Sequence, residues 1–415
     1  MSEPYVYCGP QAIPNFLTYC KEHHHNRFFM VCDHNTYPIL GQRVESLLKE
    51  QGAEVKLIYL TGEEVIADET YLMQVLLEAG DDQRAYIAVG SGTLTDITRF
   101  CSHRTRLPFL SLPTAPSVDG FTSVGAPLVF RRFKQTIPCK APEAVFADIN
   151  TLCESPRLMI ASGFGDMLGK YTALADWKLG VLIHDEIYRY DETVWQRSWK
   201  ALSGCVAQLE SIKRAGCEGV ESLFMGLIET GLCILQVGHA CPAAGAEHHL
   251  SHYLEMKLLQ ENRPAVLHGA KVGYATILVA QRYKELRQLS KAQVASLLKK
   301  APAPTVESEI ARIRAFFGPM TDLVLVQQRR LLEIIEKNWG MIQQRIIDHW
   351  DEVQQIADWL PEPAELKRML ADVGGPVTPE GITFDEKTVM AGLDYAHYLR
   401  DRITVIKLGH LLGLW

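Results

Sequence analysis

Short apolar runs alternate with helical patterns in the first 113 residues, and this alternation restricts the chain to a small group of folds. Four apolar runs predict buried strands, at 27–32, 55–60, 85–89 and 109–113. Three segments between them have helical spacing, at 42–51, 69–79 and 93–103. Strands joined through helices of about ten residues form parallel sheets. The sequence therefore predicts a doubly wound α/β sheet.

The pattern changes near residue 150. Residues 125–149 hold two apolar segments around a turn-rich stretch, which predicts a β-ribbon followed by one last strand. Beyond residue 155 the periodicity is helical, at 155–179, 192–215, 220–238, 246–260, 269–289 and 323–352. We therefore predict an α/β domain at 1–150 and an all-α domain at 151–415. The segment KAPAPT, at 300–305, predicts a loop within the helical part.

Composition excludes several classes of protein. The 415 residues are 47% hydrophobic and 22% charged, which is too apolar for a disordered chain. A net charge of −7 argues against a general nucleic-acid binder. The ten cysteines form no CxxC pair, which excludes a zinc ribbon, and their apolar surroundings predict buried free thiols. No signal peptide and no uninterrupted run of 18 apolar residues is found, so we expect a cytoplasmic protein without a membrane span.

A glycine-containing turn follows the third predicted strand. Gly90 and Gly92 stand at the start of a predicted helix, in the segment GSGTLTD (90–96). Glycine lets a pyrophosphate approach the backbone, and the N–H groups of a helix N-terminus bind anions. The spacing is not G-x-G-x-x-G, so dinucleotide binding and an ordinary turn are equally consistent with this segment.

Two further segments combine small residues with acids. PTAPSVDGFTS (113–123) follows the fourth strand, where open α/β sheets place their ligand loops, although an ordinary loop has the same composition. SGFGDMLGK (162–170) carries Asp166 and Lys170 four residues apart, on one face of a helix. A surface ion pair explains that spacing, but the apolar neighbours favour a buried acid.

Histidines gather in the segment that contains His248 and His252. These two are four residues apart on a predicted helix, so their rings project from one side. His268 follows beyond a turn at Arg263–Pro264. Two histidines and one carboxylate form a three-ligand metal site with an open position, while a histidine pair on a helix is the alternative. His249 points about 100° away and is not expected to be a ligand.

In this order, these segments resemble the sn-glycerol-1-phosphate dehydrogenases, a family that shares its fold with dehydroquinate synthase and the iron-type alcohol dehydrogenases. The longest matches are PTAPSVDGFTS, SGFGDMLGKYTALADWKL and GAEHHLSHYLEM. The similarity extends from residue 31 to residue 273, and no usable motif lies beyond residue 283. The resemblance implies an N-terminal dinucleotide-binding domain followed by an all-α metal-binding domain.

The resemblance also implies a site for NAD, with NADP possible. Asp33 would contact the adenosine ribose. The pyrophosphate loop would contain Gly90, Ser91, Gly92, Thr93, Leu94, Thr95 and Asp96. The rest of the cofactor site would contain Thr114, Ala115, Pro116, Ser117 and Ser123. Members of the family often have a third glycine where Ser91 stands, and a serine there leaves a backbone cradle possible.

One divalent metal, zinc or nickel, would be bound by Asp166, His248 and His268. Asp119, Asp166 and His252 would contact the substrate, and His252 and Asp166 would be catalytic. The implied reaction interconverts dihydroxyacetone phosphate and sn-glycerol 1-phosphate, in which the metal polarises the carbonyl and His252, or a water that it holds, relays the proton. The resemblance further implies a homo-oligomer in phospholipid metabolism, without nucleic-acid or membrane partners.

Three alternatives remain at this stage. The same fold could use glycerol or another polyol, or it could catalyse a dehydroquinate-synthase-like cyclisation without net redox change. A non-catalytic metal-binding protein is the third, but the complete set of Asp166, His248 and His268 argues against it.

Overall fold

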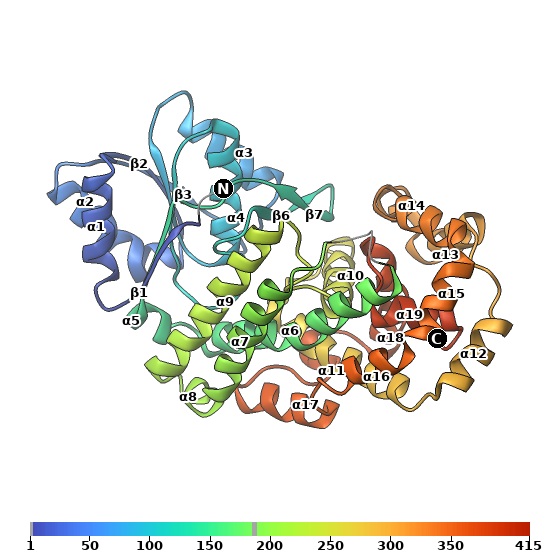
Figure 1. Cartoon of the computed structure of the whole chain (residues 1–415). Coiled ribbons are helices and arrows are strands. Elements are labelled where there is room, and N and C mark those ends of the chain that lie inside the picture. The colour runs from blue at the N-terminus through green and yellow to red at the C-terminus, as the bar shows by residue number, and fades with distance from the viewer. Residues whose placement is uncertain (1–2, 185–188) are drawn as a thin grey trace. The chain divides into compact units, whose positions relative to one another are not determined.

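Six parallel strands form the sheet, and β2 (Arg27–Asp33) lies near one side of it (Figure 1). The computed structural model describes residues 3–184 and 189–415. The strands follow the order β1-β8-β5-β4-β2-β3. Besides β2, they are β1 (Tyr5–Gly9), β3 (Glu54–Leu60), β4 (Ala85–Val89), β5 (Phe109–Leu112) and β8 (Ala144–Asp148). The predicted doubly wound sheet and its four predicted strands are confirmed.

The edge strand β1 was not predicted from the sequence. This strand has five residues, only the last of which is buried, so it lacks the apolar run that marks the inner strands. It pairs with β8, from Tyr5 opposite Ala144 to Gly9 opposite Asp148. An edge strand whose partner is so distant in sequence leaves little local signal.

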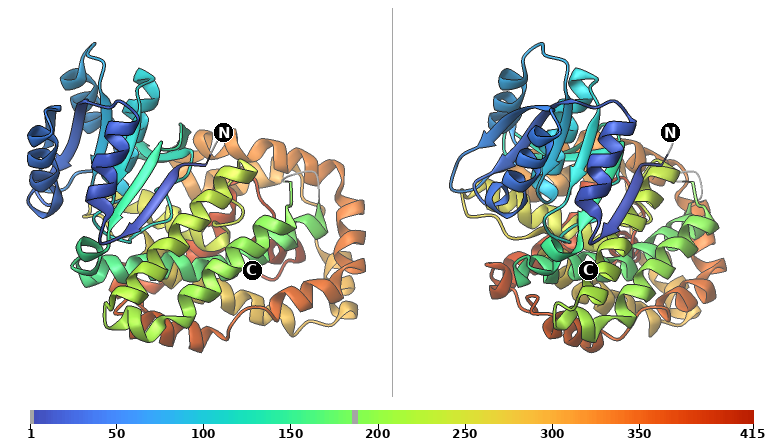
Figure 2. Two further views of the ribbon diagram at one scale, coloured as in Figure 1. Left: turned by 60° about the vertical axis from the view of Figure 1, so that its left-hand side comes forward. Right: turned by 90° about the vertical axis from the view of Figure 1, so that its left-hand side faces the viewer.

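Successive residues of β2 face opposite sides of the sheet, which explains its unbroken apolar run. Phe28 and Met30 pack in the core cluster that includes α1 (Ala12–Glu22) and α2 (Gln42–Glu50). Phe29 packs in the other cluster, with α3 (Glu69–Ala79) and α4 (Gly92–Thr105). Helices therefore cover both faces of the sheet, as Figure 2 shows.

The order of the strands reverses between β2 and β4. The chain leaves β2 for β3 on one side, and it leaves β4 for β5 on the other. Open α/β sheets bind ligands at such a reversal, beyond the carboxyl ends of the strands. Asp33 ends β2, and Gly90 follows β4, so both stand at this position in the fold.

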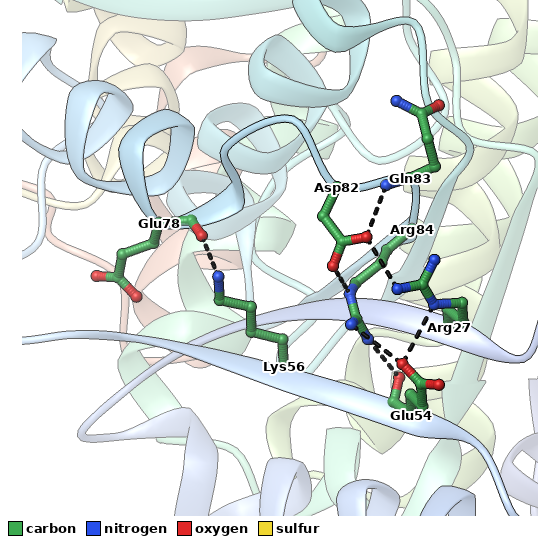
Figure 3. Close-up of polar contacts among 7 residues, drawn as sticks. All are labelled: Arg27, Glu54, Lys56, Glu78, Asp82, Gln83 and Arg84. Carbon is green, nitrogen blue, oxygen red and sulfur yellow. Dashed lines mark hydrogen bonds and ion pairs between the residues drawn. The ribbon is translucent and has the colours of Figure 1, made fainter.

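Ion pairs lie at the other end of the strands, where the strands begin (Figure 3). Arg27 pairs with Glu54 at 3.2 Å and with Asp82 at 2.9 Å. Arg84 pairs with the same two acids. Glu54 is mostly exposed, and exposed pairs contribute about 0–1 kcal/mol each. These charged side chains pair with one another, so this end of the sheet holds a structural network rather than a ligand site.

The β-ribbon predicted before the last strand is present. It consists of β6 (Gly125–Phe130) and β7 (Phe133–Pro138), which pair antiparallel. Ala126 and Leu128 of β6 are buried in the same cluster as α3 and α4. The ribbon therefore extends the core on that face of the sheet.

After β8, the described residues form helices and the loops that join them. They are α5 (Ile149–Cys153), α6 (Arg157–Ile183), α7 (Glu192–Ala207), α8 (Leu209–Lys213), α9 (Cys217–Val237), α10 (Ala246–Gln260), α11 (His268–Arg287), α12 (Lys291–Lys300), α13 (Val306–Phe317), α14 (Thr321–Lys337), α15 (Trp339–Asp348), α16 (Trp350–Ala357), α17 (Pro363–Asp372), α18 (Glu386–Tyr395) and α19 (Val405–Leu412). Residues 301–305 join α12 to α13, which confirms the predicted loop. The long helices predicted at 192–215 and 323–352 are wrong, because each is divided into shorter helices.

By their packing, the residues form two compact units. A sheet unit contains Met1–Met167 and Ser203–Gly238, and a helical unit contains Leu168–Leu202 and His239–Trp415. Two of the three points where the chain passes between units lie inside helices, α6 and α7. The predicted domain boundary at residue 150 lies just after β8, the last strand of the sheet. That boundary stays a prediction.

The cysteines are all free, as expected. Seven of them are buried, but Cys217, at the start of α9, is exposed. The prediction of burial is therefore confirmed for seven cysteines and wrong for Cys217, while Cys8 and Cys153 are half-buried. The same helix, α9, is long and apolar enough to cross a membrane, yet 61% of its most apolar window is buried within the protein. Such burial is typical of a core helix.

Candidate functional site

The turn after β4 has no room for a side chain at Gly90 or Gly92. A Cβ atom added to Gly90 would lie 2.9 Å from Cβ of Leu94, and one added to Gly92 would lie 2.9 Å from Cγ2 of Val118. Ser91 is the N-cap residue of α4, but its side chain does not cap the helix. Its hydroxyl instead hydrogen-bonds the hydroxyl of Ser117. The N-terminus of α4 thus has no side-chain cap, which leaves it suited to an anionic ligand.

The loop at 113–123 is held in place by α6 and α9. Ser162 of α6 donates to the carbonyl of Ser117 at 3.2 Å. A Cβ added to Gly163 would collide with the carbonyl oxygen of Pro116, so α6 packs directly on the loop. Thr122 donates to the carbonyl of Ile228 in α9 at 3.0 Å. The predicted cofactor residues of this loop therefore lie on a fixed segment of the sheet unit.

Arg99 fixes the end of the same loop, and the sequence analysis missed it. This fully buried side chain donates to the carbonyls of Gly120, Phe121 and Gly125, and it pairs with Asp96 at 2.8 Å. Burial lowers the pKa of Arg99, whereas Asp96 acts in the opposite direction. The three-residue spacing between Asp96 and Arg99 on a helix was the available signal.

Asp33 caps the turn that follows β2. Its Oδ1 atom accepts hydrogen bonds from the backbone N–H groups of Asn35, at 3.0 Å, and Thr36, at 2.8 Å. No described residue donates to its Oδ2 atom. One carboxylate oxygen therefore stabilises the turn while the other is available to a ligand.

Asp166, His248 and His268 come together, although they are far apart in sequence. Each offers one potential ligand atom, and these atoms lie within 4.8 Å of one another. The His248 and His268 rings have centroids 5.2 Å apart. Asp166 stands on the continuous helix α6, just before the boundary between the units, and Asp119 donates its backbone N–H to Asp166 Oδ2 at 3.0 Å. One carboxylate and two imidazoles form a donor set that suits a divalent metal.

His252 lies beside this group. Its ring centroid is 6.2 Å from that of His248 and 5.8 Å from that of His268.

Lys170 is fully buried, like Asp166, and donates to the carbonyl of Ala243 at 3.1 Å. The surface ion pair considered for Asp166 and Lys170 is therefore wrong, and the buried acid is confirmed.

Glu247 holds His248, and the sequence analysis missed this residue too. Its carboxylate contacts Nδ1 of His248 at 2.8 Å and accepts hydrogen bonds from Thr172 Oγ1, at 2.5 Å, and the Gly245 N–H, at 2.6 Å. Burial alone would raise the pKa of Glu247, but these partners keep it below its usual value. Neighbouring residues on a helix rarely face one another, so no sequence spacing pointed to this pair.

A second buried acid, Asp176, fixes the start of α10. It accepts hydrogen bonds from the backbone N–H groups of Ala246 and Val405, both at 2.7 Å, and from the Tyr283 hydroxyl at 2.6 Å. Burial, together with the nearby charge of Glu247, raises the pKa of Asp176 to about 7. Its partners lie 70, 107 and 229 residues away, so no local pattern could have identified it.

Comparison with known proteins gives close relatives over nearly the whole chain. The glycerol-1-phosphate dehydrogenase (NAD(P)+) of Geobacillus thermodenitrificans is 37% identical over 400 residues, which cover 95% of this chain and 89% of that protein. The chain belongs to the glycerol-1-phosphate dehydrogenase family. The enzyme of the same name from Bacillus subtilis is 42% identical over 286 residues, 68% of this chain and 72% of the relative. The resemblance to the sn-glycerol-1-phosphate dehydrogenases that the sequence motifs indicated is confirmed.

Two broader comparisons concern the N-terminal part of this glycerol-1-phosphate dehydrogenase family member and its fold. The family model described as iron-containing alcohol dehydrogenase matches residues 7–156. Among solved structures, glycerol dehydrogenase from Schizosaccharomyces pombe has a TM-score of 0.62 at 16% identity, over 100% of this chain and 89% of that one. Similarity at that identity shows the fold, an α/β sheet domain followed by a helical domain.

Proposed function

We propose that this protein interconverts dihydroxyacetone phosphate and sn-glycerol 1-phosphate with a nicotinamide cofactor and one divalent metal ion. The group formed by Asp166, His248 and His268 is the observation that carries this proposal. The names of the relatives support the substrate and the use of NAD or NADP. We also propose that residues 1–150 bind the dinucleotide and residues 151–415 bind the metal and the substrate.

The residues at the metal group fit such an ion. Asp166, His248 and His268 would hold it, and their oxygen and nitrogen donors suit zinc or nickel. A bound ion would supply Lewis-acid chemistry by polarising the substrate carbonyl. Three protein ligands leave a coordination position open for substrate.

The remaining roles belong to side chains near this group and in the sheet unit. His252 would relay the proton to and from the substrate oxygen, directly or through a water. Asp119, whose backbone holds Asp166, would contact the substrate. The turn at 90–96 and the loop at 113–123 would hold the pyrophosphate and complete the cofactor site, with hydride transfer supplied by the nicotinamide. Asp33 Oδ2 would accept from the adenosine ribose.

The test is an absorbance assay that follows NADH oxidation with dihydroxyacetone phosphate, with dihydroxyacetone as the comparison ketone. Glycerol is the comparison alcohol in the reverse direction, where NAD is reduced. We expect activity that a chelator abolishes and that zinc or nickel restores. His248→Ala and His268→Ala should lose both metal and activity while keeping the fold. Faster turnover of unphosphorylated polyols would favour the polyol dehydrogenase alternative, and full activity in metal-free His248→Ala would contradict the proposal.

The setting of the enzyme is a separate proposal. The family and the composition support a homo-oligomer that acts in the cytoplasm on a small molecule, without nucleic-acid or membrane partners. Light scattering on the purified protein tests the first of these, because a mass equal to one 46.6 kDa chain would contradict it.

A further inference from the structure

We propose that Glu247 is a positioning residue: it fixes the tautomer and orientation of His248 so that Nε2 is the atom offered to the metal. This inference rests on the proposed metal site. It concerns how the chain prepares that site rather than which residues bind the ion.

The two ring nitrogens of His248 have different surroundings. Nδ1 lies 2.8 Å from Oε1 of Glu247, and an ionised carboxylate can only accept a hydrogen bond. The proton of a neutral imidazole must then be on Nδ1, which leaves the lone pair on Nε2. A histidine that binds a metal commonly donates its other N–H to a carboxylate or a carbonyl, and this partner raises the basicity of the ligand nitrogen.

The carboxylate of Glu247 is itself held from three directions. Besides His248, it accepts from Thr172 Oγ1 on α6 and from the backbone N–H of Gly245 at the start of α10. The side chain is fully buried. A buried carboxylate is costly unless it is hydrogen-bonded, and these donors hold it in position beside Nδ1 of His248.

Helix α6 passes beside the pair at Gly169. A Cβ added to Gly169 of α6 would lie 3.4 Å from Cγ of Glu247, 3.7 Å from Cε1 of His248 and 2.8 Å from Cγ1 of Val272. A methyl group at Gly169 would be in ordinary van der Waals contact with Glu247 and His248, so α6 borders both side chains on that side.

The alternative role for Glu247 is to cap the start of α10 and nothing more. Asp176 already accepts from the next backbone N–H, that of Ala246, through a hydrogen bond that does not involve Glu247. The helix start therefore keeps a second anchor, so a substitution at Glu247 should leave the fold intact. The two roles predict different results for metal affinity.

The experiment compares zinc affinity and cobalt absorption spectra of metal-stripped wild type, Glu247→Gln, Glu247→Ala and Thr172→Val. Loss of an outer partner of a metal ligand typically costs about 10–100-fold in affinity. We expect a loss of that size for Glu247→Ala. Glu247→Gln should lose less, since its amide oxygen still accepts from Nδ1–H. Thr172→Val removes one of the donors that hold Glu247 but leaves its contact with His248 in place, so we expect a loss smaller than that of Glu247→Ala.

Unchanged zinc affinity in both folded Glu247 variants would overturn the inference and leave Glu247 as a helix cap. If a variant fails to fold, the wild type still decides. Long-range ¹H–¹⁵N spectra of the histidine-labelled, metal-free protein report the tautomer of His248, assigned by comparison with His248→Ala. We expect the Nδ1–H form, and an Nε2–H form would contradict the proposal. A wild type that binds no divalent metal would instead refute the proposed function, so the two failures are distinguishable.

Discussion

At the scale of single residues, the three neighbouring histidines should have two different functions, metal binding and proton transfer. His248 and His268 belong to the group of potential metal ligands, whereas His252 lies one helical turn beyond His248 on α10. Its ring is close enough to share the surroundings of the group without belonging to it. This arrangement predicts that proton transfer and metal binding can be separated by mutation.

We predict that His252→Ala retains the metal content of wild type and loses about 10²–10⁴-fold in kcat, the range typical of a positioned proton-transfer group. Metal analysis and steady-state kinetics on the same preparation check this. His248→Ala is the matched variant, and it should lose the metal as well. If His252→Ala also lost its metal, His252 would be a ligand.

Asp33 should favour NAD over NADP. Its Oδ1 atom is used by the turn, and its Oδ2 atom would face the ribose, where NADP carries a phosphate. Two unit charges about 4 Å apart repel by roughly 1 kcal/mol in water and about 4 kcal/mol at an effective dielectric near 20. We expect kcat/KM to favour NAD by about tenfold or more, since each 1.4 kcal/mol is a factor of about ten.

Asp33→Asn provides the control for that preference. An asparagine oxygen can still accept from Asn35 and Thr36, so the turn persists while the charge is removed. The ratio of kcat/KM values for the two cofactors should fall in Asp33→Asn, and further in Asp33→Ala. Equal efficiency with both cofactors in the unmutated enzyme would show that Asp33 does not act at the ribose.

At the scale of elements, a buried acid links α13 to the C-terminal helix. Glu309 of α13 contacts His410 of α19 at 3.1 Å, accepts from the Tyr398 hydroxyl at 2.7 Å and lies 3.8 Å from Lys407 Nζ. Burial alone would raise the pKa of Glu309, but His410, Lys407 and Tyr398 lower it to about 2. The pKa of this acid is therefore lower in the folded protein than its ordinary value of 4.5.

An acid with a depressed folded pKa stabilises the protein above its unfolded pKa, and this stability is lost as the pH falls towards the folded pKa. A difference of about 2.5 pKa units corresponds to roughly 3 kcal/mol. We predict that Glu309→Gln lowers the free energy of unfolding by about that amount at neutral pH, and that the difference shrinks between about pH 5 and pH 2. Denaturant unfolding across this range measures it.

The control for this pH dependence is an exposed acid. Glu333 of α14 pairs with Arg329 on the surface, with 61% of its side chain exposed, so Glu333→Gln should change stability little at any pH. A destabilisation by Glu309→Gln that stayed constant from neutral pH down to pH 2 would show that shape, and not charge, accounts for the effect.

Helix limits that are marked by local residues could be predicted from the sequence, and those without a local mark could not. The limits of α3 and α10 were predicted to the residue, and Asp68 caps the first of these helices while Gly80 ends it. The breaks after α7 and α14 were missed, because Gln208 and Asn338 are ordinary residues in a helical pattern. Neither glycine nor proline stands at these two positions, so the local sequence did not mark the helix ends.

In the candidate site, too, the residues with a local sequence pattern could be predicted and those defined by distant contacts could not. Histidine spacing and the family motifs pointed to the metal group, whose members the fold brings together. The residues that hold it, Glu247 and Asp176, depend on contacts between α6, α10 and α19, and nothing in the local sequence reports such contacts.

At the scale of the whole molecule, the sheet unit needs parts of the chain from beyond residue 150. The loop at 113–123 is anchored by Ser162 and Gly163 of α6 and by Ile228 of α9. A fragment of residues 1–150 would contain the predicted cofactor residues without these anchors. Each loop residue left disordered would have to be fixed upon binding, at about 1–2 kcal/mol for its backbone.

We therefore predict that the fragment 1–150 binds NADH at least about tenfold more weakly than the intact protein, equivalent to the ordering of one or two residues. A fragment of residues 1–238, which contains every segment of the sheet unit, is the comparison and should bind more tightly than 1–150. Calorimetry gives both affinities. Equal affinity of the fragment 1–150 and the intact protein would show that the α6 and α9 anchors are dispensable.

The interleaved order of the two units also bears on how such a gene can change over generations. The chain passes from one unit to the other after residues 167, 202 and 238, and the first two of these points are inside α6 and α7. A single recombination event cannot exchange one unit for that of a distant relative, because three joints would have to be rebuilt at once and two of them would splice foreign halves of a helix. Inheritance should therefore keep the two units together, and new specificities should arise by point substitution rather than by module exchange.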